Sequence, residues 1–349
     1  MFLGNCGNYK SFGDSKFIPR LAPERFDAIS KVSKDAETSL AKAGGAKVLY
    51  ETSTTGLMHL GYPAAGHLST YYPDSPHIKT EEIERVADFL NARKLLPENT
   101  RLRKTKSGDF EVLIASAEAQ PSESERDVRE TSWTLSDGAL AGKKLSLVYG
   151  DHAAEMSKIA DALSHAQQYA GNAHESDMQA EYVKTFRTGS MEAHLQSQRH
   201  WIRDRGPEVE CNIGFIETYR DPHGIRGEWE GFAAMVNKER TKAFGKLVES
   251  APEQIPKLPW GKEFEKDEFL SPDFTSLEVL TFAGSGVPAG VRLTVDDIVK
   301  QKYYADIHRS TSPTMTVSGR RRASRTSVWA TSSAPRLSLI HISEPTRPY

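Results

Sequence analysis

The sequence has few cysteines, no long apolar run and no excess of either charge. Cys6 and Cys211 are the only cysteines among 349 residues. The chain therefore has neither a disulfide framework nor a cysteine-based metal cage, and it suits a reducing compartment. No stretch approaches the roughly 18 apolar residues of a membrane span, and the first residues do not form a signal peptide. We expect a cytoplasmic protein that does not enter a membrane.

The charge balance excludes further classes of partner. Lys and Arg number 45, Asp and Glu 47, and the net charge is −2. Because the two signs are intermixed, the chain has no broad basic surface for nucleic acid or for an anionic membrane. The sequence carries no signal for an oligomeric state.

The patterns along the first half of the chain predict strands grouped with strands and helices with helices. Thr80 is expected to cap an amphipathic helix that buries Ile83, Val86 and Leu90. Residues 101–119 resemble two antiparallel strands joined at 107–109, and 143–150 resemble a further antiparallel strand. This grouping predicts an α+β fold.

Two helices are expected next. Asp151 is predicted to cap the first, which ends near Gly171. The apolar residues at helical spacing are expected in the core, and they are Met156, Ile159, Ala160, Leu163, Met178, Tyr182, Val183 and Phe186. A helical stretch around 237–250 and a strand running into a glycine-rich bend follow later.

The stretch GFIETYRDPHGIRGEWEGF, residues 214–232, is the strongest candidate for a binding site. Asp-Pro-His-Gly at 221–224 has the residues of a tight turn, so its flanks are expected to pair as a hairpin. Period two then places Glu217 and Tyr219 on one face. Pairing from the turn would set Glu217 opposite Glu228 and Tyr219 opposite Arg226, so that two carboxylates face each other.

This acidic hairpin allows two interpretations. The carboxylates can splay into water on an exposed sheet face, where they have no binding role. Alternatively, they form a site for an ammonium group, because paired carboxylates accept charge-assisted hydrogen bonds from an amine. A nearby tyrosine hydroxyl could then donate to a carbonyl oxygen that gains negative charge during a reaction.

Other motifs are weak. His174-Glu175 starts like a zinc helix, but Met178 stands where a second histidine would be needed. His194 and His200 are six residues apart, which does not place them on one helix face. The glycine-rich stretch 284–290 lacks the Lys-Ser/Thr end of a phosphate loop. Its glycines and proline instead predict a sheet edge whose amides could pair with an extended peptide.

Four segments together resemble the dipeptidyl peptidase III family. They are GNYKSFGDSKFIP (7–19), GSMEAH (189–194), GFIETYRDPHGIRGEWEGF (214–232) and FEKDEFLSPDFTSLEVLTFAGSGVPAG (264–290). The resemblance runs in continuous order over residues 4–290. It implies a zinc-dependent cytosolic enzyme that removes dipeptides from the N-termini of short peptides. It also implies a lower lobe around an antiparallel five-stranded β-barrel, a helical upper lobe that carries zinc, and a cleft between them.

The resemblance also implies roles for individual residues. The positions of Glu217 and Tyr219 would contact the substrate's amine and the scissile carbonyl, with Tyr219 as the catalytic group, and Glu230 would bind substrate in the same region. A second set would guide the peptide along the edge strand of the lower lobe, and its members are Gly286, Pro288 and Ala289.

The family's zinc motifs, HExxGH and EECxAE, match nothing in this chain. Without them no metal would polarise a peptide carbonyl or acidify a bound water. We therefore expect a fragment with no zinc ligands that does not hydrolyse peptides, although the complete family enzyme would contain zinc. A peptide-binding module without catalysis is the alternative function.

The resemblance suggests a division of the chain. Residues 1–237 correspond to the lower-lobe domain with its N-terminal part missing, 238–275 to a segment crossing to the upper lobe, and 276–290 to the return. Residues 291–349 are expected to be non-native and disordered. Their codons fit a retained intron followed by a frameshift, and LSLIHISEPTR at 337–347 resembles a translated sequencing adapter.

Overall fold

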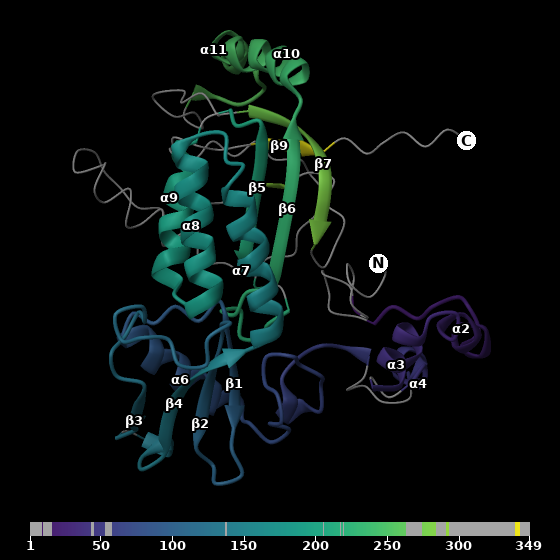
Figure 1. Ribbon diagram of the computed structural model, residues 1–349, viewed down its shortest axis with the longest axis vertical. Helices are drawn as coiled ribbons and strands as arrows, with labels where there is room; N and C mark the ends of the chain where they lie inside the picture. The colour runs from purple at the N-terminus through teal and green to yellow at the C-terminus, as the bar shows by residue number, and fades with distance from the viewer. Residues whose placement is uncertain are drawn as a thin grey trace. The chain divides into compact units, whose positions relative to one another are not determined.

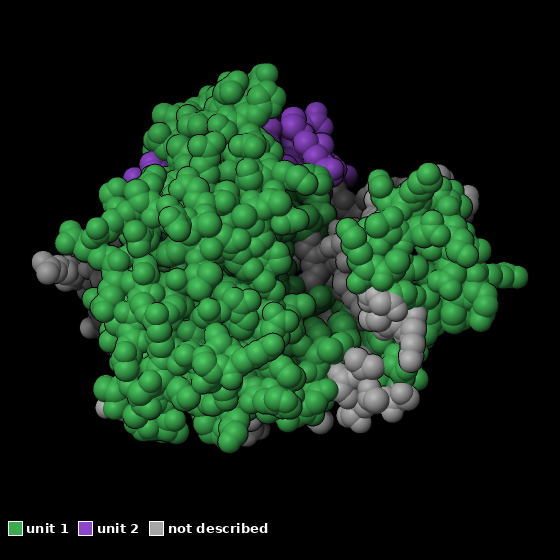
Figure 2. Space-filling view, turned by 60° about the horizontal axis from the view of Figure 1, so that its bottom comes forward, with its two compact units in different colours: residues 1–197, 211–232, 281–287 green, residues 198–210, 233–280, 288–349 purple. Residues whose placement is uncertain are grey.

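The computed structural model describes residues 9, 16–42, 45–52, 58–136, 138–204, 206–216, 218, 220–262, 274–283, 291–292 and 339–342. Its contacts divide the chain into two units (Figure 2). The first holds residues 1–197, 211–232 and 281–287, and the second holds 198–210, 233–280 and 288–349. The α+β expectation is confirmed, because helices and two sheets make up both units. None of the helices in the described part of the chain has the length and apolar character that crossing a bilayer requires.

The chain begins with short helices and a longer one that packs on the first sheet. These helices are α2 (Pro23–Ser30), α3 (Lys34–Lys42), α4 (Lys47–Tyr50), the 3-10 turn η1 (Pro63–Ala65) and α6 (Thr80–Ala92). Ile83, Val86 and Leu90 are buried, as their spacing predicts. The cap differs from the prediction: the backbone N–H of Lys79, one residue before Thr80, donates to the Glu82 carboxylate at 2.9 Å. Glu82 can do this because it lies in the first turn of the helix.

The first sheet has the strand order β1-β2-β4-β3. Its strands are β1 (Thr100–Lys104), β2 (Phe110–Ala115), β3 (Ser132–Thr134) and β4 (Lys144–Asp151), with the 3-10 turn η2 (Gly138–Leu140) before β4. The turn at 107–109 joins β1 to β2 as predicted, and Gly108 adopts φ +84° there. However, β4 runs parallel to β2, whereas its sequence suggested antiparallel pairing. The long connection between them brings the chain back to the same end of the sheet.

The main core lies between α6 and this sheet. Val112 and Leu147 are paired across β2 and β4, and both are buried. The other members of the apolar cluster come from the same elements and from the turns around them, and they include Tyr71, Tyr72, Ile78, Leu102, Phe110, Ile114, Leu135, Leu140 and Leu145. Burial of this much apolar surface stabilises the first unit.

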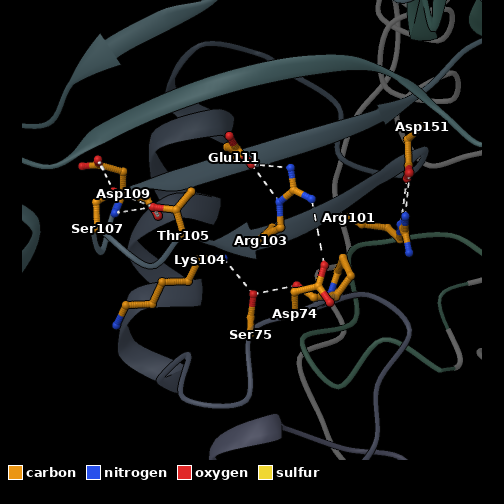
Figure 3. Close-up of polar contacts among 11 residues, drawn as sticks. Asp74, Ser75, Arg101, Arg103, Lys104, Thr105, Ser107, Asp109, Glu111 and Asp151 are labelled. Carbon is orange, nitrogen blue, oxygen red and sulfur yellow. Dashed lines mark hydrogen bonds and ion pairs between the residues drawn. The ribbon is translucent and has the colours of Figure 1, made fainter.

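Charged side chains line β1 and are paired along its length (Figure 3). Arg101 makes two contacts with Asp151, at 2.7 and 2.5 Å. Arg103 lies between Glu111 and Asp74.

Asp151 was predicted to cap the following helix, and this prediction is wrong. Asp151 ends β4, and His152, with φ +55°, is the residue that precedes the helix. The Asp151 carboxylate instead accepts two charge-assisted hydrogen bonds from the Arg101 guanidinium.

Three longer helices follow the first sheet. They are α7 (Ala153–Gln167), α8 (Ala173–Thr188) and α9 (Met191–Arg203), and α7 and α8 pack side by side (Figure 1). The predicted core residues Met156, Ala160, Leu163, Met178, Tyr182 and Phe186 are buried, whereas Ile159 and Val183 are half-buried. The first helix ends at Gln167, before Gly171. Asp127 from a distant loop caps α9: it accepts from Ser190 Oγ at 2.5 Å and Met191 N at 2.7 Å.

The second sheet has the strand order β5-β6-β7-β9-β8. Its strands are β5 (Val209–Phe215), β6 (Trp229–Val236), β7 (Phe274–Ala283), β8 (Val291–Arg292) and β9 (Leu339–Ile342). Between β6 and β7 the chain forms α10 (Lys238–Glu249), α11 (Ala251–Gln254) and the 3-10 turn η3 (Ile255–Lys257). Asn237 caps α10 by accepting from Arg240 N at 3.0 Å.

The expected antiparallel five-stranded barrel is not confirmed. The described strands form two open sheets, and each sheet contains a parallel pair, β2 with β4 and β7 with β9. The segment 291–349, expected to be disordered, contributes the short strands β8 and β9. Its remaining residues lie outside the described part of the chain.

Candidate functional site

The connection between β5 and β6 carries the candidate site, and its turn forms as predicted. Gly224 N donates to the carbonyl oxygen of Asp221 at 2.9 Å, which closes the 221–224 turn. The strands end earlier than a tight hairpin requires, because β5 stops at Phe215 and β6 starts at Trp229. Residues 216–228 form the connection between the two strands, and Ile216 N donates to the carbonyl oxygen of Glu228 at 2.9 Å. The predicted pairing of Glu217 with Glu228 stays a prediction, because Glu217 lies outside the described residues.

Of the predicted site residues, Glu230 is the one that the structure describes. It lies on β6 and is half-buried. The other five lie outside the described residues, and they are Glu217, Tyr219, Gly286, Pro288 and Ala289. Their roles stay predictions.

The negative charge of Glu228 in the connection is balanced by Arg220. Arg220 Nε lies 3.3 Å from Glu228 Oε1, and the two side chains are 16% and 10% exposed. The contact is an ion pair without the alignment of a hydrogen bond. Arg220 Nη2 also donates to the carbonyl oxygen of Tyr9 at 2.9 Å. The cation that balances Glu228 thus comes from the chain itself.

Asp221 and Arg226 form a second ion pair, and both side chains are fully buried. Asp221 Oδ2 lies 3.5 Å from Arg226 Nη1 and accepts from the backbone N–H groups of Ile225 and Arg226 at 3.1 and 3.0 Å. Asp221 Oδ1 accepts from the hydroxyl of Tyr72 at 2.9 Å and from His223 N at 3.1 Å. Arg226 was predicted to lie opposite Tyr219 in a strand pair. Tyr219 lies outside the described residues, so that pairing stays a prediction. Arg226 itself precedes β6, and its side chain is fully buried beside Asp221.

Two tyrosines pack beside these charges. Burial raises the pKa of Tyr72, and its hydroxyl stays protonated and can donate to Asp221. Burial also raises the pKa of Tyr71, and the negative charges of Glu228 and Asp221 raise it further. The Arg226 guanidinium lies 5.4 Å from the centre of the Tyr72 ring, a distance suited to a cation–π contact.

Gly227 lies near the end of the connection, where its backbone meets the backbones of Glu98 and Phe215. Its N–H donates to the carbonyl oxygen of Glu98 at 2.8 Å. A Cβ at this position would lie 2.7 Å from the carbonyl carbon of Phe215, which is too close for any other residue without backbone movement. The close approach lets the chain return beside β5.

Sequence reasoning missed the roles of Arg220, Asp221 and Arg226. One signal was available for Asp221, because aspartate at the first position of a turn often accepts from the backbone two residues later. The contact from His223 N fits that pattern. No local signal indicates that Tyr72 and Tyr9, far away in the sequence, would complete the two ion pairs.

The described residues contain no group of three or more His, Cys, Asp or Glu side chains that could hold a metal ion. His194, considered as a ligand, is buried against Gly214, and burial lowers the pKa of its imidazole to about 4. Cys211 is a buried thiol that accepts from Gln179 Nε2 at 3.4 Å. These residues do not fit a zinc ion, so we derive no chemical step through one.

Comparisons with known proteins agree on one family. The family model described as "Peptidase family M49" matches residues 44–310. A protein named dipeptidyl peptidase 3 from Dictyostelium discoideum is 44% identical over 300 residues, which is 86% of this chain and 41% of that protein. The human protein of the same name is 42% identical over 308 residues, 85% of this chain and 41% of its own length. The chain thus spans about two fifths of these relatives.

A solved structure of DPP III from Caldithrix abyssi has a similar fold. It matches with a TM-score of 0.51 and 15% identity, covering 80% of this chain and 48% of that one. At this identity the likeness concerns the fold alone. The match nevertheless agrees with the family model, whose matched range includes the connection between β5 and β6.

Proposed function

Because the chain belongs to peptidase family M49, we propose that the 216–228 connection and the start of β6 bind the N-terminal end of a short peptide. The family match is the observation that carries this proposal, since it covers the acidic connection continuously. Relatives at 44% and 42% identity are named dipeptidyl peptidase 3, and dipeptide release needs recognition of a free amino terminus.

The proposed roles follow the chemistry of each side chain. Glu217 and Glu230 would accept hydrogen bonds from the peptide's ammonium group, which carboxylates bind more strongly than neutral acceptors do. Tyr219 would donate to the carbonyl oxygen of the bond after the second residue, where negative charge develops during hydrolysis. The backbone around Gly286, Pro288 and Ala289 would pair with the extended peptide.

Hydrolysis needs groups that this sequence does not contain. The printed sequence has no HExxGH and no EECxAE motif, and the described residues offer no metal cluster. We therefore expect the 349-residue chain to bind peptides without cleaving them, and we expect zinc to be needed only in the complete family enzyme. Its low cysteine content suits a cytoplasmic location.

Isothermal titration calorimetry tests the binding function. A tetrapeptide with a free amine is expected to bind, and the same peptide with an acetylated amine is expected to bind at least about tenfold more weakly. Glu230→Gln should remove most of that difference. Glu249→Gln, which changes an exposed glutamate on α10, is the matched control and should leave it unchanged. Equal affinity for both peptides would contradict an ammonium site.

A second assay separates binding from catalysis. The chain is incubated with a dipeptidyl-arylamide, with and without added zinc, and released arylamine is measured. We expect no release above buffer in either condition and less than one equivalent of tightly bound zinc. Release that a chelator abolishes would show that the chain is itself a metallopeptidase.

A further inference from the structure

Gly214 on β5 lies directly opposite Glu230 on β6. The hydrogen bond from Ile216 N to the carbonyl oxygen of Glu228, at 2.9 Å, fixes one pair of positions. Neighbouring pairs of an antiparallel ladder follow by moving back along one strand and forward by the same number of residues along the other. Residue 214 is therefore paired with residue 230.

A second contact agrees with this register. The same rule pairs Ile213 with Gly231, and a Cβ on residue 231 would lie 3.5 Å from Ile213 Cγ2. The two strands thus keep one register from 213 to 216, without a shift at Gly214.

The space beside Glu230 is filled from another element. Directly opposite residues of an antiparallel pair point to the same face, with Cβ atoms about 4.5–5.5 Å apart. Gly214 has no side chain, and a Cβ there would lie 2.7 Å from Cε1 of His194 on α9. The imidazole therefore takes the place of the cross-strand neighbour of Glu230. All three residues belong to the first unit.

We propose that His194 is a positioning residue for peptide binding, which gives the Glu230 side chain a polar but uncharged neighbour. The inference rests on the proposed function above, in which Glu230 accepts from the peptide's ammonium group. A cationic neighbour would compete with the ammonium for the carboxylate. An apolar neighbour would desolvate the carboxylate and disfavour its charged form. The imidazole does neither, because burial lowers its pKa to about 4 and it stays neutral at pH 7.

Glu228 shows what a charged neighbour does. Its carboxylate lies 3.3 Å from Arg220 Nε, and the side chains of this pair are 10% and 16% exposed. A paired carboxylate presents little net charge to a cationic ligand. The neutral ring of His194 brings no such counter-charge to the face that carries Glu230.

A purely structural role for His194 is the competing interpretation. The side chain is 5% exposed, and its ring centre lies 6.3 Å from that of Tyr182, so it also contributes to packing. The two roles predict different results. Packing alone changes the stability of the chain and leaves the affinity of the folded protein for a peptide unchanged.

Calorimetric titration of the whole chain with the free-amine and acetylated tetrapeptides tests the role. His194→Leu is expected to raise Kd for the free-amine peptide about fivefold and to leave Kd for the acetylated peptide unchanged. His194→Gln, which keeps a neutral polar side chain, should stay within about twofold of the wild type. Adding His194→Leu to Glu230→Gln should have no further effect, because His194 acts through the carboxylate that is already lost.

Leu195→Ala is the matched control. Leu195 follows His194 on α9 and is 2% exposed. Its truncation leaves a cavity and should lower stability. It should nevertheless leave both Kd values unchanged.

An NMR measurement of the His194 Cε1–H resonance gives a readout without a peptide. Glu230→Gln should shift this resonance, because a charge close to the ring is lost, while the exposed His174 should be unaffected. In the wild type, the free-amine peptide should shift it and the acetylated peptide should not. These spectra also decide the matter if His194→Leu fails to fold.

Any of four results would overturn the inference. They are wild-type affinity in His194→Leu, equal losses in His194→Gln and His194→Leu, losses that multiply in the double variant, and a His194 resonance that Glu230→Gln does not move. A wild-type chain that does not distinguish the two peptides would contradict the proposed function itself.

Discussion

His194 packs against Gly214 so closely that a Cβ on residue 214 would lie 2.7 Å from the imidazole Cε1. Both residues belong to the first unit, and His194 is 5% exposed. The backbone of β5 and the ring from α9 can approach each other only because residue 214 has no side chain.

Gly214→Ala should therefore destabilise the protein. The ring or the strand must move to admit the methyl group, and overpacking of this kind costs about 1–3 kcal/mol. Urea denaturation measures the change in the free energy of unfolding. Gly245→Ala is the matched control: a Cβ there meets nothing within 4 Å, and residue 245 lies inside α10. It should stabilise by about 0.5–1 kcal/mol, because alanine favours helix more than glycine does. Equal effects of the two changes would contradict the packing argument.

The buried imidazole of His194 should make stability depend on pH. Burial lowers its pKa from 6.5 to about 4. The unfolded chain therefore binds this proton at a higher pH than the folded chain does. Stability is fully present above pH 6.5 and falls as the pH drops towards 4, by roughly 3 kcal/mol in all.

Urea midpoints measured between pH 7 and pH 4 test this pH dependence. His194→Gln should flatten the curve over that range, whereas His174→Gln, which changes an exposed histidine, should keep the wild-type slope. A wild-type slope in His194→Gln would show that other groups cause the loss.

Loss of the Asp221 charge should be costly. Asp221→Asn leaves the fully buried Arg226 without its counter-charge, and an uncompensated buried charge costs about 3–5 kcal/mol. Adding Arg226→Met should restore part of the stability, because neither charge is then buried. Glu208 and Lys238 form an ion pair in which the side chains are 67% and 68% exposed, respectively. Glu208→Gln breaks this pair and should change stability by less than about 1 kcal/mol. Thermal and urea unfolding of the wild type and these three variants measure the changes in stability. A double variant less stable than Asp221→Asn would contradict the argument that the buried charge causes the loss.

Local sequence patterns determined much of the fold. The spacing of Ile83, Val86 and Leu90 predicted both a helix and the face that it buries, and the turns at 107–109 and 221–224 form where their residues favour them. These features depend on residues a few positions apart, so the sequence alone contains the information. The same holds for the family, since the motif segments are contiguous.

The tertiary structure decided which charges are paired. Arg220 donates to Tyr9, which is 211 positions away in the sequence, and Arg226 donates to Tyr72, which is 154 positions away. Asp151 pairs with Arg101 and does not cap the helix that follows it. It likewise decided that β4 runs parallel to β2. A carboxylate's partner depends on which distant segments the core brings beside it, and short-range periodicity contains nothing about that choice. For this reason the sequence could indicate an acidic connection, while only the folded chain showed that Arg220 already balances Glu228.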